Sequence, residues 1–72
     1  MPHRNIVYTK HAMQRRLERD ISDDDIKKAI DEPNYVISSF EGRMIATKKI
    51  NSRTIQVVYK EEVNKIIIIT VY

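Results

Sequence analysis

The 72-residue sequence contains no cysteine, no tryptophan, one glycine and two prolines. Without cysteine the chain has no disulfide framework, no cysteine-ligated metal and no thiol nucleophile. Its longest apolar run, residues 66–69, is far shorter than the about 20 residues of a membrane span. The first ten residues contain no apolar stretch of signal-peptide length. We therefore expect one cytoplasmic domain over residues 1–72, with no membrane partner, no metal and no cofactor.

The basic residues are unevenly distributed along the chain, which has a net charge of +3. Residues 1–20 hold five Lys and Arg against two acids, residues 21–34 hold two against five, and residues 35–72 hold six against three. If the two basic parts meet in the fold, they form one basic face, which suits a nucleic acid. The alternative is a solvated surface on which the charges are scattered.

β-Branched residues dominate the apolar composition, with twelve Ile and six Val against one Leu. Such side chains favour strands, and the short polar turns in the second half favour an antiparallel meander. We predict an α+β domain in which two helices pack on one face of a four-stranded antiparallel sheet, with a short N-terminal strand that can add a fifth. The expected elements are strands at 6–8, 35–41, 43–50, 54–60 and 65–72, and helices at 10–19 and between Ser22 and Pro33.

Polar residues mark the ends of both predicted helices. Thr9 can accept a hydrogen bond from a free N–H of the first turn, and Asp20 can adopt the left-handed conformation at the end of the first helix. Ser22 begins the second helix, and Pro33 ends it. The acidic run Asp23–Asp25 suits the positive end of the helix dipole. A metal site formed by these three carboxylates is the alternative interpretation.

Apolar side chains one helical turn apart indicate which face each helix buries. On the first helix Met13 and Leu17, with Ala12 beside them, form a narrow apolar stripe. The only phenylalanine, Phe40, is expected in the core as well. The second helix is expected to bury Ile26, Ala29 and Ile30.

The candidate catalytic residues are His11, Arg15 and Arg19, which follow one another at intervals of four on the first helix. This spacing places them in one cationic stripe, roughly opposite Met13 and Leu17. A neutral imidazole can accept a proton, and guanidinium groups can hold a phosphate by paired hydrogen bonds. The combination suits metal-independent phosphodiester cleavage by a ribose 2′-hydroxyl. The alternative is that a helix simply keeps its charges on its solvent face.

Further basic and aromatic residues are candidates for nucleic-acid binding. They are Arg16, Lys48, Arg53 and Tyr59, because cations bind phosphates and tyrosine rings can stack on bases. Lys48 and Lys49 are adjacent in a strand, so only one of them can join a given surface. A strand tyrosine is more often a packing residue, which is the alternative interpretation of Tyr59. His3 is assigned no role.

The order of residues at the start of the chain resembles the opening motif of a protein family. The sequence has His11-Ala12, then Arg15, Arg19 and Ile21-Ser22. It resembles a small prokaryotic family of unknown function whose members open with T-x-H-A-x-x-R-x-x-x-R-G-I-S, followed by an acidic helix, a proline and a strand meander. The resemblance covers essentially the whole chain. It departs at Asp20, where the family usually has Gly, and this affects the helix cap more than any chemistry.

In length and element order that family is similar to the RelE/ParE and BrnT toxins of type II toxin–antitoxin systems, which include ribonucleases. The resemblance implies a RelE-like fold, an RNA substrate and an antitoxin protein as partner. No catalytic residue of these toxins is carried over to this chain. His11 as general base or acid, with Arg15 and Arg19 as phosphate ligands, is nominated by the motif of the family of unknown function together with the chemistry of these side chains. The alternatives are a non-catalytic nucleic-acid-binding or protein-interaction module, and a structural domain that pairs with a second copy of itself.

Overall fold

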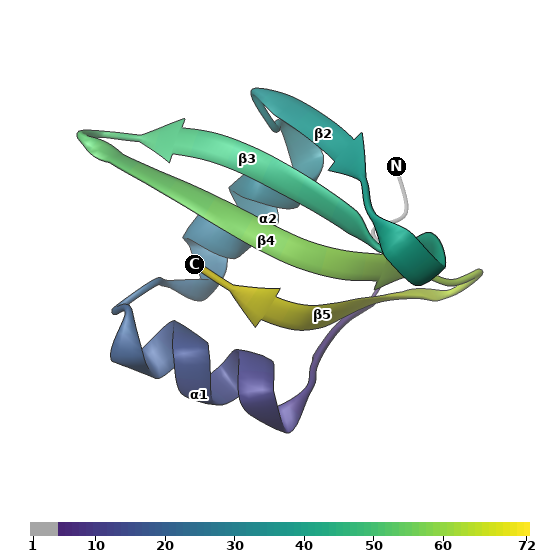
Figure 1. Cartoon of the computed structure of the whole chain (residues 1–72). Helices are drawn as coiled ribbons and strands as arrows, with labels where there is room; N and C mark the ends of the chain where they lie inside the picture. The colour runs from purple at the N-terminus through teal and green to yellow at the C-terminus, as the bar shows by residue number, and fades with distance from the viewer. Residues whose placement is uncertain (1–4) are drawn as a thin grey trace.

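The computed structural model describes residues 5–72; His3, and Arg4 from the basic first part of the chain, lie outside the described residues. Two helices are followed by a strand meander, with one strand before them (Figure 1). The elements are β1 (Asn5–Tyr8), α1 (Lys10–Glu18), α2 (Asp23–Asp31), β2 (Tyr35–Ser38), the 3₁₀ turn η1 (Phe40–Gly42), β3 (Met44–Ile50), β4 (Arg53–Glu61) and β5 (Lys65–Val71).

The sheet has five strands in the order β1-β5-β4-β3-β2. Strands β2 to β5 form the predicted antiparallel meander, but β1 pairs in parallel with β5, matching Ile6 with Ile66 and Tyr8 with Ile68. The α+β class is therefore confirmed, whereas the predicted four-stranded antiparallel sheet is instead five-stranded and mixed. The parallel strand joins because the helices and the meander together act as a long crossover that returns the chain beside β1.

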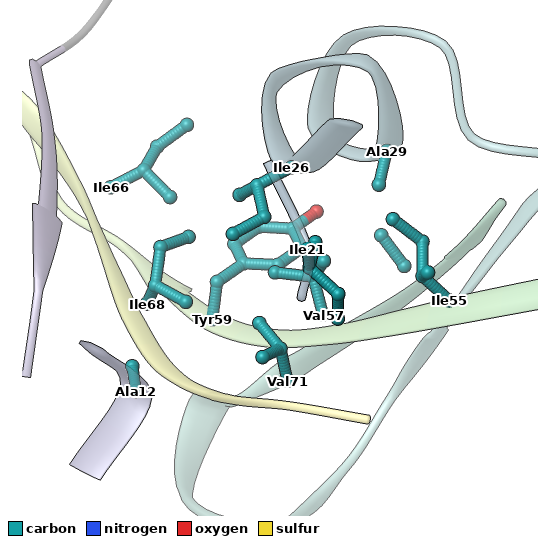
Figure 2. Packing of buried hydrophobic residues seen from close by; sticks show 11 residues of the cluster. Ala12, Ile21, Ile26, Ala29, Ile55, Val57, Tyr59, Ile66, Ile68 and Val71 are labelled. Carbon is teal, nitrogen blue, oxygen red and sulfur yellow. The ribbon is translucent and has the colours of Figure 1, made fainter. Parts of the chain in front are cut away.

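Both helices pack on the same face of the sheet. Ala12 of α1 and Ile26 of α2 are completely buried, in one cluster with Ile55 of β4 and Ile68 of β5. Figure 2 shows these side chains pointing toward one another, with the ring of Tyr59 in the middle of the cluster. In Figure 1, α2 crosses behind β3 and β4, and α1 lies alongside β5. The opposite face of the sheet, called the open face below, carries no helix among residues 5–72.

Two predictions about buried residues are wrong. Met13 and Leu17 are exposed, Leu17 by 70%, and α1 packs on β5 through Ala12 instead. The short side chain of Ala12 lets the helix backbone approach β5 closely, which leaves the Met13/Leu17 stripe outside the contact. Phe40, expected in the core, is 83% exposed, because it lies in η1, beyond the end of β2 and away from the helices.

The predicted cap residues Thr9, Asp20 and Ser22 are confirmed. The Thr9 hydroxyl accepts from the backbone N–H of Ala12 at 3.0 Å, and the Ser22 hydroxyl accepts from that of Asp25 at 3.1 Å. Asp20 has a φ of 54°, in the left-handed region, where α1 ends. The only glycine, Gly42, has a φ of 74°, which fits its place in the turn between β2 and β3.

A basic side chain on the β3–β4 hairpin reaches the connection between the two helices. Arg53, the first residue of β4, donates from Nη1 to the carbonyl oxygen of Asp20 at 3.0 Å and from Nη2 to the carbonyl oxygen of Arg19. These carbonyl oxygens follow the last turn of α1, where no backbone N–H of the helix is available to donate a hydrogen bond to them. Arg53 therefore ties the hairpin to the α1–α2 connection.

Candidate nucleic-acid interface

The three candidate catalytic residues follow one another along α1, but they differ in their surroundings. His11 is exposed in the first turn, Arg15 is half-buried one turn later, and Arg19 is the exposed C-cap. Their spacing of four places them along one side of the helix, as predicted. That side is not opposite the buried one, because Arg15 lies next to buried Ala12 on the helix surface.

Arg15 extends from α1 to the end of β5. Its guanidinium carbon lies 5.7 Å from the ring centroid of Tyr72, a cation–π contact. The Nε atom is buried and has no hydrogen-bond partner among residues 5–72, and no carboxylate pairs with the side chain in that range. Arg15 therefore holds a positive charge at the helix–sheet boundary with hydrogen-bond donors that the described residues leave unused.

Arg16 lies on the other side of Ala12, and its side chain makes contacts that hold parts of the fold together. Its Nε atom donates to the carbonyl oxygen of Ile21 at 3.0 Å, and its guanidinium lies 5.4 Å from the ring centroid of Tyr8. These contacts join α1, β1 and the connection between α1 and α2. Arg16 therefore points away from the Arg15–Tyr72 contact rather than adding to it.

A second polar network begins at the same tyrosine. The Tyr8 hydroxyl donates a hydrogen bond to Asp23, whose carboxylate also accepts from Lys27 at 3.1 Å. The hydrogen bond from Tyr8 lowers the pKa of Asp23 below its usual value, and Lys27 acts in the same direction. Burial and the hydrogen bond to the Asp23 carboxylate raise the pKa of Tyr8. The network anchors the first turn of α2 to β1.

The remaining predicted binding residues lie on the helix-covered side of the sheet. Lys48 pairs with the core residue Ile55 in the strand register and is half-buried. Arg53 binds the carbonyls after α1. Tyr59 is 4% exposed within the core, where no base can reach its ring. The structure thus does not bring Arg16, Lys48, Arg53 and Tyr59 onto one surface with His11 and Arg15.

The open face carries residues that the sequence analysis did not select. Tyr35 pairs with Thr47, and Thr47 with Gln56. Gln56 in turn exchanges two backbone hydrogen bonds with Tyr72, at 3.3 and 2.9 Å. Directly opposed residues point to the same face of a sheet. Because Val57, next to Gln56, points into the core, these four residues form a row across the open face with a tyrosine at each end.

Charge on the open face has one sign. The register places Lys49, Lys60 and Lys65 there, and no Asp or Glu occupies a strand position of this face between residues 5 and 72. Lys65 is 3.7 Å from Glu62, whereas Lys49 and Lys60 form no ion pair within that range. Apolar residues of this face lie between the tyrosine row and Lys60, at Ile37, Ile45 and Val58, and beside Lys60, at Val7 and Ile67.

The sequence contained only part of the signal for this surface. Strand alternation requires Lys48 and Lys49 to point to opposite faces, but only the burial of Ala46 in the structure shows that Lys49 is the one on the open face. The contact between Arg15 and Tyr72 joins residues 57 positions apart and depends on how α1 packs, so no local pattern indicates it.

Other kinds of site find little support in the described part of the chain. Residues 5–72 hold no group of three or more His, Asp and Glu side chains able to bind a metal ion, Asp23–Asp25 included. A shallow hollow at the β4–β5 turn is lined by Glu62–Lys65 and includes none of the candidate residues. In the same range, no helix has the length and apolar character needed to cross a membrane.

A comparison with protein families matches residues 8–72 to the model described as Domain of unknown function (DUF4258). The match includes both helices, the whole meander, Arg15 and Tyr72. No curated protein and no solved structure gives a significant match.

Proposed function

Because the chain belongs to the DUF4258 family, whose description names no activity, we propose a function from its own residues: metal-independent RNA cleavage of the toxin–antitoxin type. His11 is the general base, and Arg15 and Arg19 bind the scissile phosphate. The family's order of elements, helices before an antiparallel meander, resembles that of the RelE/ParE and BrnT toxins. This likeness supports the class of the reaction, and the side chains of α1 support its chemistry.

The environment of Arg15 is the observation that carries the proposal. A half-buried guanidinium with no carboxylate partner among residues 5–72 keeps its charge available for an anion. Contact with Tyr72 fixes its position one helical turn from His11, so that a phosphate bound by Arg15 lies within reach of the imidazole. Arg19 adds a second cation one turn further along.

The chemistry needs no group beyond these side chains. His11 takes the proton of a ribose 2′-hydroxyl, and the 2′-oxygen then forms a bond to the adjacent phosphorus. The bond from phosphorus to the 5′-oxygen breaks, and the leaving oxygen takes up a proton from the imidazolium. The products are a 2′,3′-cyclic phosphate and a 5′-hydroxyl. The two arginines stabilise the negative charge that grows on the phosphate oxygens.

The test is cleavage of an end-labelled single-stranded RNA by the purified protein in excess EDTA, with the products resolved by electrophoresis and mass spectrometry. The wild-type protein is expected to yield 2′,3′-cyclic phosphates, and His11→Ala to lose about 10²–10⁴-fold in rate. Arg15→Ala is expected to lose a comparable amount, which Arg15→Lys restores only in part because lysine lacks the planar fork.

Lys28→Ala is the matched control, since Lys28 is an exposed cation on α2, away from this side of α1. It is expected to cleave at the wild-type rate. Equal cleavage by wild type and His11→Ala, or loss of activity in EDTA, contradicts the assignment. The toxin role is tested separately, by growth arrest on expression and its relief by co-expression of a small acidic protein encoded beside the gene.

One observation favours the alternative of a binding module that does not cleave. Within residues 5–72, no hydrogen bond orients the His11 imidazole, although a general base is usually held by a partner. The same assay separates the two functions. A binding module retains the RNA intact, with a steep salt dependence of the affinity.

A further inference from the structure

We propose that the open face of the sheet binds single-stranded RNA, with Tyr35 and Tyr72 stacking on bases and Lys49 and Lys60 contacting phosphates. This inference rests on the proposed function for the identity of the nucleic acid as RNA. The surface itself is argued from the strand register, the exposure of the two tyrosines and the charges on the face.

The two tyrosines have the exposure and the placement that base stacking needs. Tyr35 is 55% exposed and Tyr72 is 47% exposed, at opposite ends of the row that includes Thr47 and Gln56. Three inter-strand spacings separate them, roughly 14 Å. Two rings at this distance on one sheet can stack on different bases of the same strand. A duplex offers no such free base faces, so the geometry favours a single strand.

The charges of the face complement a phosphate backbone. Lys49 and Lys60 lie in β3 and β4 on either side of the tyrosine row, both exposed and without an ion pair among residues 5–72. Arg15 joins the row at Tyr72. With no Asp or Glu at a strand position of this face in the described chain, no carboxylate repels a backbone that crosses it. A polyanion is therefore the occupant that the charges fit.

The middle of the face supplies polar groups without partners. Thr47 and Thr70 are 4% and 8% exposed, and their hydroxyl oxygens form no hydrogen bond within residues 5–72. A buried hydroxyl without a partner is unfavourable. A small outward movement of the flanking side chains on base binding gives each hydroxyl access to the donors and acceptors of a base edge. Apolar neighbours such as Ile45 and the exposed Ile37 provide the surface on which a base ring rests.

Contact between Arg15 and Tyr72 connects this face with the proposed cleavage site. When an RNA base stacks on Tyr72, the neighbouring phosphate of the RNA lies within reach of Arg15. His11 is one helical turn away from Arg15. The open face therefore delivers unpaired RNA to α1, and the enzyme is expected to prefer single strands to duplexes.

The experiment measures binding of a fluorescein-labelled 2′-O-methyl RNA decamer by fluorescence anisotropy. This probe lacks the 2′-hydroxyl that the proposed cleavage needs, so binding is measured whether or not the protein cleaves RNA. Tyr35→Ala and Tyr72→Ala are each expected to weaken binding about tenfold or more, whereas Tyr35→Phe, which keeps the ring, stays within about twofold of wild type. Lys49→Gln and Lys60→Gln are each expected to reduce the slope of log affinity against log salt by about 0.7.

Two controls match these variants. Phe40→Ala removes an aromatic ring that is more exposed than either tyrosine but lies in η1, off the row. Lys28→Gln removes a cation from α2, on the other side of the sheet. Both are expected to bind like wild type, and circular dichroism with thermal unfolding confirms that every variant keeps its fold.

Wild-type affinity in Tyr35→Ala and Tyr72→Ala overturns the proposal, as does equal binding of the decamer and its duplex. Failure to bind the probe, combined with self-association that Ile37→Ser abolishes in sedimentation, overturns it in favour of a protein occupant. Tight, tyrosine-dependent binding of the probe together with intact unmodified RNA in the cleavage assay supports this surface and contradicts only the endonuclease.

Discussion

Arg53 Nη1 lies 3.0 Å from the carbonyl oxygen of Asp20, so the hairpin between β3 and β4 is fixed to the end of α1 by a side chain more than thirty residues away in sequence. We expect Arg53→Ala to lower the free energy of unfolding by about 1 kcal/mol, because both the Asp20 and the Arg19 carbonyls lose a charged donor. Chemical denaturation measures the loss. Arg43→Ala is the matched control, since its ion pair with Glu41 is exposed and 3.8 Å long, and its expected cost is below about 0.5 kcal/mol.

Asp20 is a position where glycine is expected to stabilise the fold. Its φ of 54° is unfavourable for a residue with a Cβ atom, and glycine has no such penalty. Asp20→Gly is expected to raise the free energy of unfolding by about 0.5–1 kcal/mol, seen as a rise of about 3–6 °C in Tm by calorimetry. The same change at Asp24, in the first turn of α2, should lower the stability by a similar amount. A fall in Tm for Asp20→Gly argues against strain at this residue.

The burial of Tyr8 and its hydrogen bond to Asp23 make stability depend on pH at both ends of the scale, through the pKa of Tyr8 and the pKa of Asp23. The pKa of Asp23 is lowered in the folded state, so its contribution is present above the unfolded value of about 4 and is lost as the pH falls below it. The pKa of Tyr8 is raised, so its contribution is present below about pH 10 and is lost as the pH rises further.

We therefore expect Tyr8→Phe to cost about 1 kcal/mol between pH 5 and 9, a value reduced by the solvent exposure of Asp23. The difference from wild type should shrink toward both extremes of pH. Urea unfolding across the pH range measures it. A difference between the two proteins that stays constant down to pH 2 is incompatible with the proposed role of the carboxylate.

Substitution of Ala12 is expected to lower the stability more than substitution of Leu17, although leucine is the more hydrophobic residue. Ala12 is completely buried between α1 and β5, so Ala12→Leu overpacks this contact and should cost about 1–3 kcal/mol or more. Leu17 is 70% exposed, and Leu17→Ala should change the stability by no more than about 0.5 kcal/mol. Comparable losses in the two variants would mean that α1 buries its Met13/Leu17 stripe after all.

Local signals in the sequence were sufficient for the parts of the fold that local chemistry controls. Thr9 and Ser22 cap their helices, and Asp20 and Gly42 adopt positive φ values, because hydroxyl acceptors and backbone freedom act within a few residues. The β-branched composition and the polar turns likewise located the strands of the meander, although the first predicted strand, 35–41, ends at Ser38 because residues 40–42 form η1.

What the sequence did not predict depends on contacts between distant segments. A helix with few apolar residues has no strong preferred face, so the choice of Ala12 over Met13 and Leu17 follows from how closely α1 can approach β5. In the candidate site, the spacing of His11, Arg15 and Arg19 could be predicted from the sequence, but the contact of Arg15 with Tyr72 could not. Which of Lys48 and Lys49 faces the open side depends on which side the helices cover, and a strand pattern alone does not contain that information.

The parallel pairing of β1 with β5 has a consequence for synthesis of the chain on the ribosome. Ile6 and Tyr8 find their partners only in Ile66 and Ile68, and the sheet position between β1 and β4 stays empty until residues 65–71 have emerged. Until then α1 has no surface on which to bury Ala12, since its main packing partner is β5. Until β5 is available, the nascent chain exposes its first helix and the growing meander, so the folding of these elements is expected to be a late, all-or-none event. The proposed catalytic stripe and the tyrosine row are completed only in that same event, when β5 and Tyr72 join the sheet.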